Sequence, residues 1–167
     1  MESNEQFNAP AYFKMLAEKN KLAVANKFKA IYASPESMLG VLDEYRKVKN
    51  FVLVDDTCSQ NTFSKGHGFF DRQVYSVMIL AGYRMDDMDD RQEALKLCRR
   101  IFRQMHSRMI NDKFYRKYGD MLEYLDVNTV ASRELDRYFL NGVTGLTFFV
   151  NNIEPTDLTF NKDEWED

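Results

Sequence analysis

Cysteine, glycine and proline are scarce in this sequence. The 167 residues include only two cysteines, Cys58 and Cys98, which lie far apart and outside any CxxC or Cys/His pattern. This usage excludes a disulfide framework and a cysteine-bound zinc site, and it is typical of a reducing cytoplasm. Because the seven glycines and three prolines form no linker or low-complexity tract, we expect a single domain over residues 1–167.

Neither sign of charge dominates, and long apolar runs are absent. The chain has 23 lysines and arginines against 26 aspartates and glutamates, which gives no global attraction to nucleic acid or anionic lipid. No apolar run approaches the roughly 18 residues of a membrane span. The start, MESNEQFNAP, is polar and acidic, whereas a signal peptide is basic and then apolar. We therefore expect neither a membrane nor nucleic acid as the partner.

The first 49 residues are expected to form a helical N-terminal segment. Pro10 suits the first turn of a helix that begins after Asn8, and Ser34, followed by a proline, suits the N-cap of a second helix. The apolar residues of this second helix recur at helical spacing: Met38, Val41, Leu42, Tyr45 and Val48. We expect it to end near Lys49.

Two strands are predicted next, over residues 51–55 and 69–83, because both runs are rich in β-branched and aromatic residues. The polar segment 56–68 between them is longer than a tight hairpin requires, and we predict a loop. Alternation in the longer run predicts three residues on one face and three on the other: Tyr75, Val77 and Ile79 against Ser76, Met78 and Leu80.

The clearest helix is predicted over residues 91–110, and strands are predicted over 121–135 and 145–150. The apolar residues of the helix form one stripe: Ala94, Leu95, Cys98, Ile101, Phe102, Met105 and Met109. The predicted class is α+β, with an antiparallel or mixed sheet packed against a long central helix and the element order ααββαββ. We assign 50–155 to the α+β core and 156–167 to an acidic C-terminal tail.

The stretch MDDMDD at residues 85–90 contains Asp-Asp-x-x-Asp, a pattern that holds magnesium against a diphosphate in some enzymes. Those enzymes are large helical bundles with a second acidic cluster, whereas this chain is short and has a predicted sheet. The stretch also precedes the clearest helix, where Asp90 is a candidate N-cap and Glu93 would complete a capping box. We favour the cap, and we expect no metal and no cofactor.

The run FVLVDDT at residues 51–57 resembles the strand and acidic pair of phosphoribosyltransferases, in which Asp55 and Asp56 would face a ribose. The following CSQNTF lacks the glycine that lets backbone N–H groups wrap a phosphate. We interpret the run as a strand end that leads into an Asx-type turn. Nucleophile, phosphate-loop and dinucleotide motifs are absent, so we assign no catalytic residue and do not expect an enzyme.

Charges are segregated near the clearest helix, with bases along it and acids before it. An ordinary solvated face also carries such charges. The segregation would equally allow the acids of one subunit to meet the bases of a neighbour in a head-to-tail ring. The candidate subunit-contact residues are Lys96, Arg99, Arg100, Arg103, Asp86, Asp87 and Asp89.

The run VDDTCSQNTFSKGHGFFDRQVYSVMILAGYRMDDMDDRQEALKLCRRIFRQMHSRMIND resembles a pattern in uncharacterised tail-region proteins of bacterial prophages. Its features are a short strand with an acidic end, a loop, an aromatic start to a second strand, and a long helix. Over residues 45–155 the order of elements is similar to that of the tail-terminator proteins of long-tailed bacteriophages. The N-terminal helices and the C-terminal LTFNKDEWED depart from that pattern and leave another neck or tail component open.

The resemblance implies a structural virion protein. Tail terminators form a ring, commonly a hexamer, that caps the tail tube and joins it to the head. The implied partners are further copies of the chain, the tail tube protein and head-neck proteins. The implied location is the virion, and the bacterial cytoplasm during assembly.

Two other functions remain open from the residues. A small nucleic-acid-binding module would use the basic stripe of the clearest helix, formed by Lys96, Arg99, Arg100 and Arg103, although the acidic total of the chain disfavours it. A metal-dependent enzyme would use the aspartate pairs.

Overall fold

The computed structural model describes residues 7–45, 47–136 and 141–166. Its helices are α1 (Ala9–Lys19), α2 (Lys21–Ala25), α3 (Met38–Glu44) and α4 (Met88–Phe114). Its strands are β1 (Lys29–Tyr32), β2 (Asn50–Val54), β3 (Ser59–Lys65), β4 (Gly68–Gly82), β5 (Leu125–Glu134) and β6 (Val143–Thr156). Two short 3₁₀ helices, η1 (Pro35–Ser37) and η2 (Lys162–Glu164), complete the described elements.

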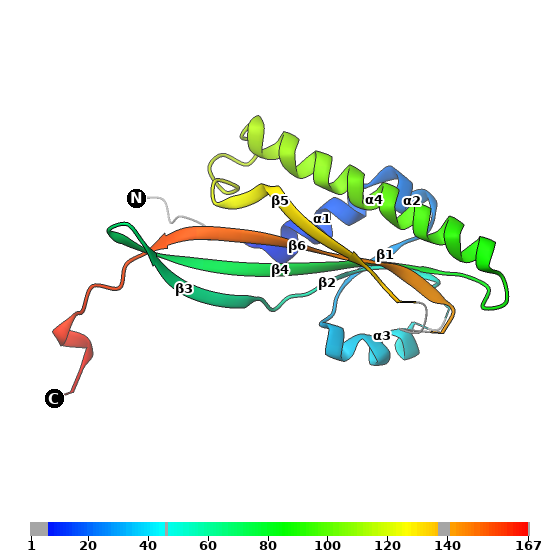
Figure 1. Ribbon diagram of the computed structural model, residues 1–167, viewed down its shortest axis with the longest axis horizontal. Coiled ribbons are helices and arrows are strands. Elements are labelled where there is room, and N and C mark those ends of the chain that lie inside the picture. The colour runs from blue at the N-terminus through cyan, green and yellow to red at the C-terminus, as the bar shows by residue number, and fades with distance from the viewer. Residues whose placement is uncertain (1–6, 46, 137–140, 167) are drawn as a thin grey trace.

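All the described strands belong to one mixed sheet with the order β1-β2-β4-β6-β5, and β3 pairs with β4 as well. β1 and β2 are parallel, while the other pairs are antiparallel. Helices α1, α2 and α4 cover one face of the sheet, and α3 lies against the other (Figure 1). The predicted α+β class, a sheet packed against a long helix, is confirmed.

The alternation predicted for the long central strand is confirmed. Tyr75, Val77 and Ile79 of β4 lie in the core under α1 and α4, whereas Met78 and Leu80 lie in the smaller cluster under α3. The second half of β4 is buried on both faces because helices cover both faces of this part of the sheet. The apolar stripe of α4 is also confirmed, since its central residues are fully or almost fully buried: Leu95, Cys98, Ile101, Met105 and Met109.

The N-terminal segment contains a strand that the sequence analysis missed. The predicted first helix is interrupted at Asn20 and ends at Ala25, and β1 then pairs with β2 from Lys29↔Phe51 to Tyr32↔Val54. A strand of this length shows too few alternating positions to be separated from helical spacing. Residues 1–49 are therefore not wholly helical.

The second predicted helix begins differently and is shorter than expected. The Ser34 hydroxyl accepts a hydrogen bond from the Ser37 backbone N–H at 3.3 Å, which starts the 3₁₀ turn η1 and not an α-helix. The α-helical part, α3, ends at Glu44, before the predicted end near Lys49. Val41, Tyr45 and Val48 pack on the small cluster under α3, while Met38 and Leu42 have side chains outside the described set.

The predicted loop 56–68 is largely a β-hairpin, and that prediction is wrong. β3 pairs with β4 from Ser59↔Val74 to Lys65↔Gly68, and Gly66 and His67 form the connecting turn. Gly66 has a φ of +65°, which a two-residue hairpin turn requires at such a position. β3 was missed because most of its residues are exposed, so it lacks the apolar alternation that identifies a half-buried strand.

The last two strands are present with shifted ends. β5 begins at Leu125, four residues after the predicted start at Met121, because residues 115–124 form turns. β6 extends to Thr156 and pairs with almost the whole of β4. The tail outside the sheet consequently begins at Asp157.

A buried carboxylate joins α1 to α4. Asp112 is fully buried, and it accepts hydrogen bonds from the Tyr12 hydroxyl at 3.1 Å and from Arg108 Nε at 2.6 Å. Burial, followed by the charge of Asp112, raises the pKa of Tyr12 far above its usual value, so the hydroxyl remains a donor. The Tyr118 ring packs edge-on to Tyr12. The network fixes how α1 sits against α4.

Replacing Tyr12 by phenylalanine tests this network. Because Asp112 would lose one of its two donors, we expect the free energy of unfolding to fall by about 1–3 kcal/mol. Tyr32 is exposed, and Tyr32→Phe is a control that should change stability by less than about 0.5 kcal/mol. Urea denaturation followed by circular dichroism measures both. Equal effects of the two substitutions would contradict the role assigned to the network.

Candidate functional site

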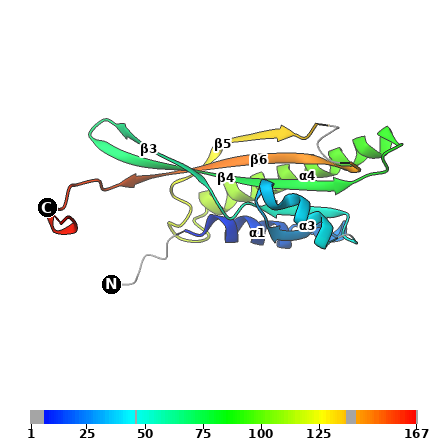
Figure 2. The same ribbon diagram turned by 90° about the horizontal axis from the view of Figure 1, so that it is seen from below.

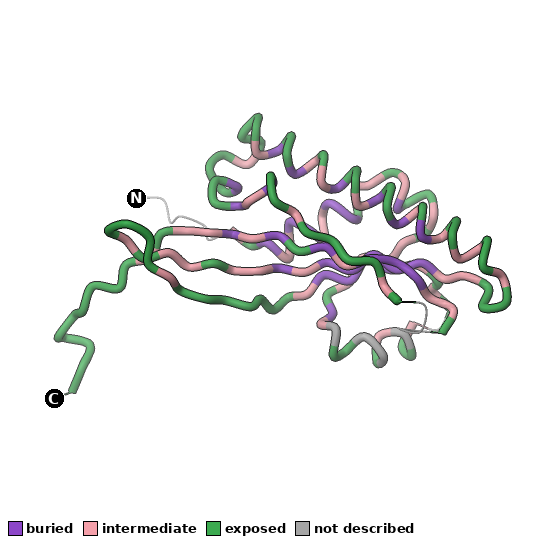
Figure 3. Tube along the Cα trace, in the orientation of Figure 1, coloured by how far each residue is buried: buried purple, intermediate pink, exposed green. Residues whose placement is uncertain are grey.

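The outward face of α4 carries the predicted basic stripe. Leu95, Cys98 and Ile101 point into the core, so the intervening residues at helical spacing must point to solvent. The members of the basic stripe are all exposed: Lys96, Arg99, Arg100 and Arg103. Figure 3 shows this pattern as buried and exposed positions that alternate along α4. The predicted placement of the stripe opposite the apolar face is confirmed.

Two of these cations have partners in the same chain. Lys96 pairs with Glu93 at 2.6 Å on the same helix. Arg99 makes a bidentate contact with Glu134 of β5, with distances of 2.5 Å from Nε and 2.9 Å from the second nitrogen. Within the part of the chain that the structure describes, Arg100 and Arg103 form no ion pair. They are the members of the stripe most available to a partner.

The Arg99–Glu134 pair perturbs both groups. The hydrogen bond to Arg99 lowers the pKa of Glu134, and the same bond raises the pKa of Arg99. Both side chains are nearly half exposed, so solvent screening limits the contribution to less than about 1 kcal/mol. The pair ties the middle of α4 to the outer strand of the sheet.

The start of α4 differs from the prediction. The N-cap is Asp87, whose Oδ1 accepts a hydrogen bond from the Asp90 N–H at 3.0 Å. Asp90 lies inside the first turn and accepts from the Arg84 N–H at 2.8 Å, so Asp90 is not the N-cap and Glu93 completes no capping box. The helix begins one turn earlier because Asp87 can cap it equally well and two further acids then fall in the positive first turn.

The aspartates at the start of α4 differ in whether they have an ion-pair partner. Asp87 also accepts from an Arg84 guanidinium nitrogen at 2.5 Å, and Asp90 lies 3.6 Å from Arg84 Nε. Asp86 and Asp89 are exposed. From Asp89 to Arg99 the helix rises about 15 Å, so the acidic end and the basic stripe are separate surfaces of one subunit.

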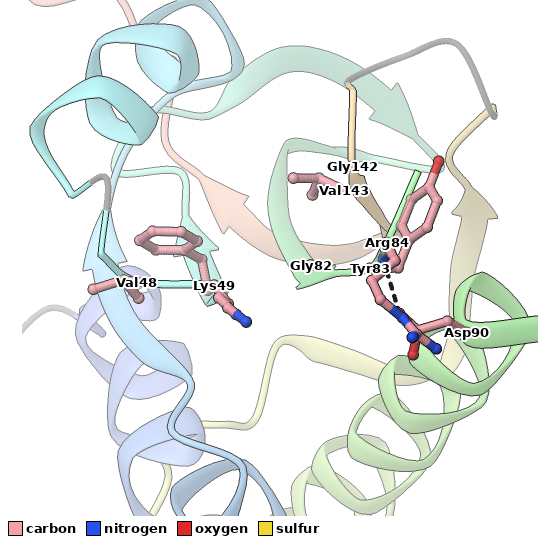
Figure 4. Close-up of a pocket in the computed structure, with 9 residues that line it drawn as sticks. Val48, Lys49, Gly82, Tyr83, Arg84, Asp90, Gly142 and Val143 are labelled. Carbon is pink, nitrogen blue, oxygen red and sulfur yellow. Dashed lines mark hydrogen bonds and ion pairs between the residues drawn. The ribbon is translucent and has the colours of Figure 1, made fainter. Parts of the chain in front are cut away.

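A shallow pocket lies beside Arg84. Its volume is about 310 Å³, and it opens between the residues before β2, the end of β4 and the start of β6 (Figure 4). The lining contains Lys49, Tyr83 and Arg84, together with apolar groups such as Val143. The guanidinium of Arg84 is already neutralised by its two carboxylate neighbours. Sequence reasoning missed this pocket because its walls come from segments far apart in the chain.

The other acidic pair behaves as predicted. Asp55 Oδ1 accepts from the Thr57 N–H at 3.0 Å and from the Thr57 hydroxyl at 2.7 Å, so the strand ends in an Asx turn. Among the described residues, no three histidine, cysteine, aspartate or glutamate side chains gather in a way that would hold a metal ion.

Three further side chains could take part in chemistry: His106, Cys98 and His67. Each has the surroundings of a structural or a surface residue. His106 lies 2.7 Å from the Val127 carbonyl oxygen through Nε2 and stacks on Phe102. Burial raises the pKa of Cys98 to about 12, so its thiol stays protonated at neutral pH. His67 is exposed at the tip of the β3–β4 hairpin.

Among the described helices, none combines the length and the apolar character that a membrane crossing requires. Comparison of the chain with protein-family models, with curated proteins and with solved structures finds no match. Any functional conclusion therefore depends on the surfaces described above.

The N-cap assignment predicts which aspartate matters for stability. Asp87→Ala should lower the free energy of unfolding by about 1 kcal/mol because the first turn loses its cap. Asp86 is adjacent and exposed, so Asp86→Ala should have an effect below about 0.5 kcal/mol. Thermal unfolding with and without magnesium should give the same melting temperature. A magnesium-dependent rise that disappears in Asp86→Ala would instead support a metal site.

The Glu134 carboxylate is expected to make a pH-dependent contribution to the free energy of unfolding. Since its pKa is lowered by folding, the stabilisation is present above the unfolded pKa of about 4.3 and is lost as the pH falls through the folded value. Glu134→Gln should therefore be less stable than the natural chain at neutral pH, by less than about 1 kcal/mol. The difference should vanish in acid. Denaturation curves across that range measure it, and a difference that does not change with pH would rule out the pair as its source.

Proposed function

We propose that this protein is a structural subunit of a bacteriophage tail, a tail terminator or a neck component, that forms a ring with copies of itself. The observation that carries the proposal is a β-sheet arm that extends past the helices (Figures 1 and 2). The arm consists of β3, the first half of β4 and the last residues of β6. A ring component of this kind works by contact with other proteins and needs no catalytic group.

The arm leaves aromatic side chains partly or largely exposed. Phe63 and Phe70 stack on one face with ring centroids 5.9 Å apart, and Arg72 lies over Phe63. Phe69 at the start of β4 is 47% exposed. Figure 3 shows buried positions only where the helices cover the sheet. Exposed aromatic side chains on a projecting arm favour burial against another protein.

The sheet also has open edges at which a neighbour can add hydrogen bonds. Among the described strands, β3 pairs with β4 alone and β5 with β6 alone. Both outer strands are rich in polar residues, which protects such edges from unspecific pairing in the free subunit. An edge of this type supports contacts made during ordered assembly.

The segregated charges support a head-to-tail arrangement of subunits. Arg100 and Arg103 of one subunit would lie toward acids of the next, either Asp86 and Asp89 or those of the C-terminal tail, because a heterologous contact repeated around a closed axis joins two different surfaces. Arg99 and Asp87 contribute less to this contact than the sequence suggested, since each already has a partner in its own chain.

Native mass spectrometry and negative-stain electron microscopy, with and without tail tubes, test the proposal. We expect a hexameric ring, or monomers that assemble into a ring on the end of a tube. Phe69→Ser should preserve the fold and weaken assembly. Val24→Ser, at an exposed apolar residue on α2, is the matched control and should assemble normally.

Two results would contradict the proposal. One is a monomer that neither associates at high concentration nor binds tail tubes. The other is tight binding to DNA that weakens steeply with salt, which would favour a nucleic-acid module built on the basic stripe.

A further inference from the structure

The basic stripe of α4 continues into an apolar patch. Ile110 and Phe114 follow Arg103 at helical spacing on the same outward face, and they are 44% and 77% exposed. Tyr115, beside Phe114, is 71% exposed. The rings of Phe114 and Tyr115 touch edge to face with centroids 5.0 Å apart. The outward face of α4 is therefore basic along its middle and apolar at its C-terminal end.

The C-terminal tail, residues 157–166, has a composition that complements this face. Its apolar side chains are more than half exposed: Leu158, Phe160 and Trp165. It carries four acids against one lysine: Asp157, Asp163, Glu164, Glu166 and Lys162. Leu158 and Phe160 come first and most of the acids follow. The order along the tail is therefore apolar and then acidic.

The tail leaves its own subunit. It begins where β6 ends at the arm, opposite the start of β4, and it leads away from the helices (Figure 1). Within the described residues, its hydrogen bonds join tail residues to each other, such as Thr159 to Asp157 and Asp163 to Asn161. Phe160 and Trp165 stack on each other with their centroids 6.3 Å apart.

We propose that this tail docks on the outward face of α4 of a second copy of the chain. Leu158 and Phe160 would cover Ile110 and Phe114, and the acids from Asp163 onward would lie along the basic stripe. Arg100 and Arg103 are the main cations of the contact. The proposal rests on the proposed function, because it names a contact that joins neighbouring subunits in the ring.

The dimensions of the two surfaces agree. Along α4, Ile110 and Arg100 are separated by a rise of about 15 Å. With η2 and the Phe160–Trp165 stack opened, a fully extended chain from Leu158 to Glu166 would span at most about 26 Å, which is sufficient to cover both the apolar patch and the cations. The described tail has a net charge of -3, from four acids and one lysine, and charge of this sign steers it toward the stripe.

Trp165 gives a direct readout, because it is the only tryptophan in the sequence. Two full-length variants separate the two surfaces. The tail variant Leu158→Ser/Phe160→Ser/Trp165→Ser keeps the stripe and has no tryptophan. The stripe variant Arg100→Glu/Arg103→Glu keeps the tail and its tryptophan. Neither variant should associate with itself through this contact.

Mixing the two variants should restore the contact. As the tail variant is added to the stripe variant, Trp165 emission should move to shorter wavelength, its anisotropy should rise, and a heterodimer should appear in native mass spectra. A chain that carries both sets of substitutions is the matched control. It should bind the stripe variant at least about tenfold more weakly than the tail variant does. Adding Asp163→Lys/Glu164→Lys to the stripe variant should recover part of its self-association.

Three results would overturn the docking proposal. The first is that the control binds the stripe variant as tightly as the tail variant does, which would show that the stripe is not part of the contact. The second is short-wavelength Trp165 emission in a natural chain that is monomeric, which would place the tail on its own subunit. The third is normal ring formation by the tail variant, which would leave the proposed function intact. Failure of the natural chain to assemble at all would instead count against that function.

Discussion

The structure depends on the packing of α4 against the middle of β4 and β6. Ile101 and Met105 of α4 lie in the same core as Phe148 of β6, and each such buried side chain contributes about 1.5–3 kcal/mol. Because this apolar stripe must face the sheet, the residues at the opposite helical angle must face solvent. The position of the basic stripe and of the apolar patch beyond it therefore follows from the core.

The same packing explains which features were predictable from the sequence. The α4 stripe and the alternation from Tyr75 to Leu80 were predictable because burial imposes a period on many consecutive residues. β3 was not, since its residues are mostly exposed and burial imposes no period on them. The N-cap was placed one turn late because four aspartates in MDDMDD satisfy the same local rule. A start at Asp87 also places two further acids, Asp89 and Asp90, in the positive first turn.

The candidate site also combines features that were predictable from the sequence with features that were not. Exposure of Arg100 and Arg103 was predictable from helical spacing, but the pairing of Arg99 with Glu134 was not. Glu134 reaches α4 because β5 pairs with β6 in a register that shifts between Asp126 and Ala131, and no local sequence rule specifies that shift. The arm was not predictable for another reason: its aromatic residues, such as Phe69, lie outside the core, so core packing imposes no period on them. The tail was predicted from its acidic composition alone.

Backbone amide exchange, measured on the free subunit and on the assembled particle, tests the central claim that these surfaces join subunits. The account predicts that exchange slows on assembly in three places: along β3, in the tail from Asp157 to Glu166, and at the exposed C-terminal end of α4. The amides in the middle of β4, already paired on both sides with β2 and β6, should change little. Unchanged exchange in all three places in an assembled particle would contradict the account.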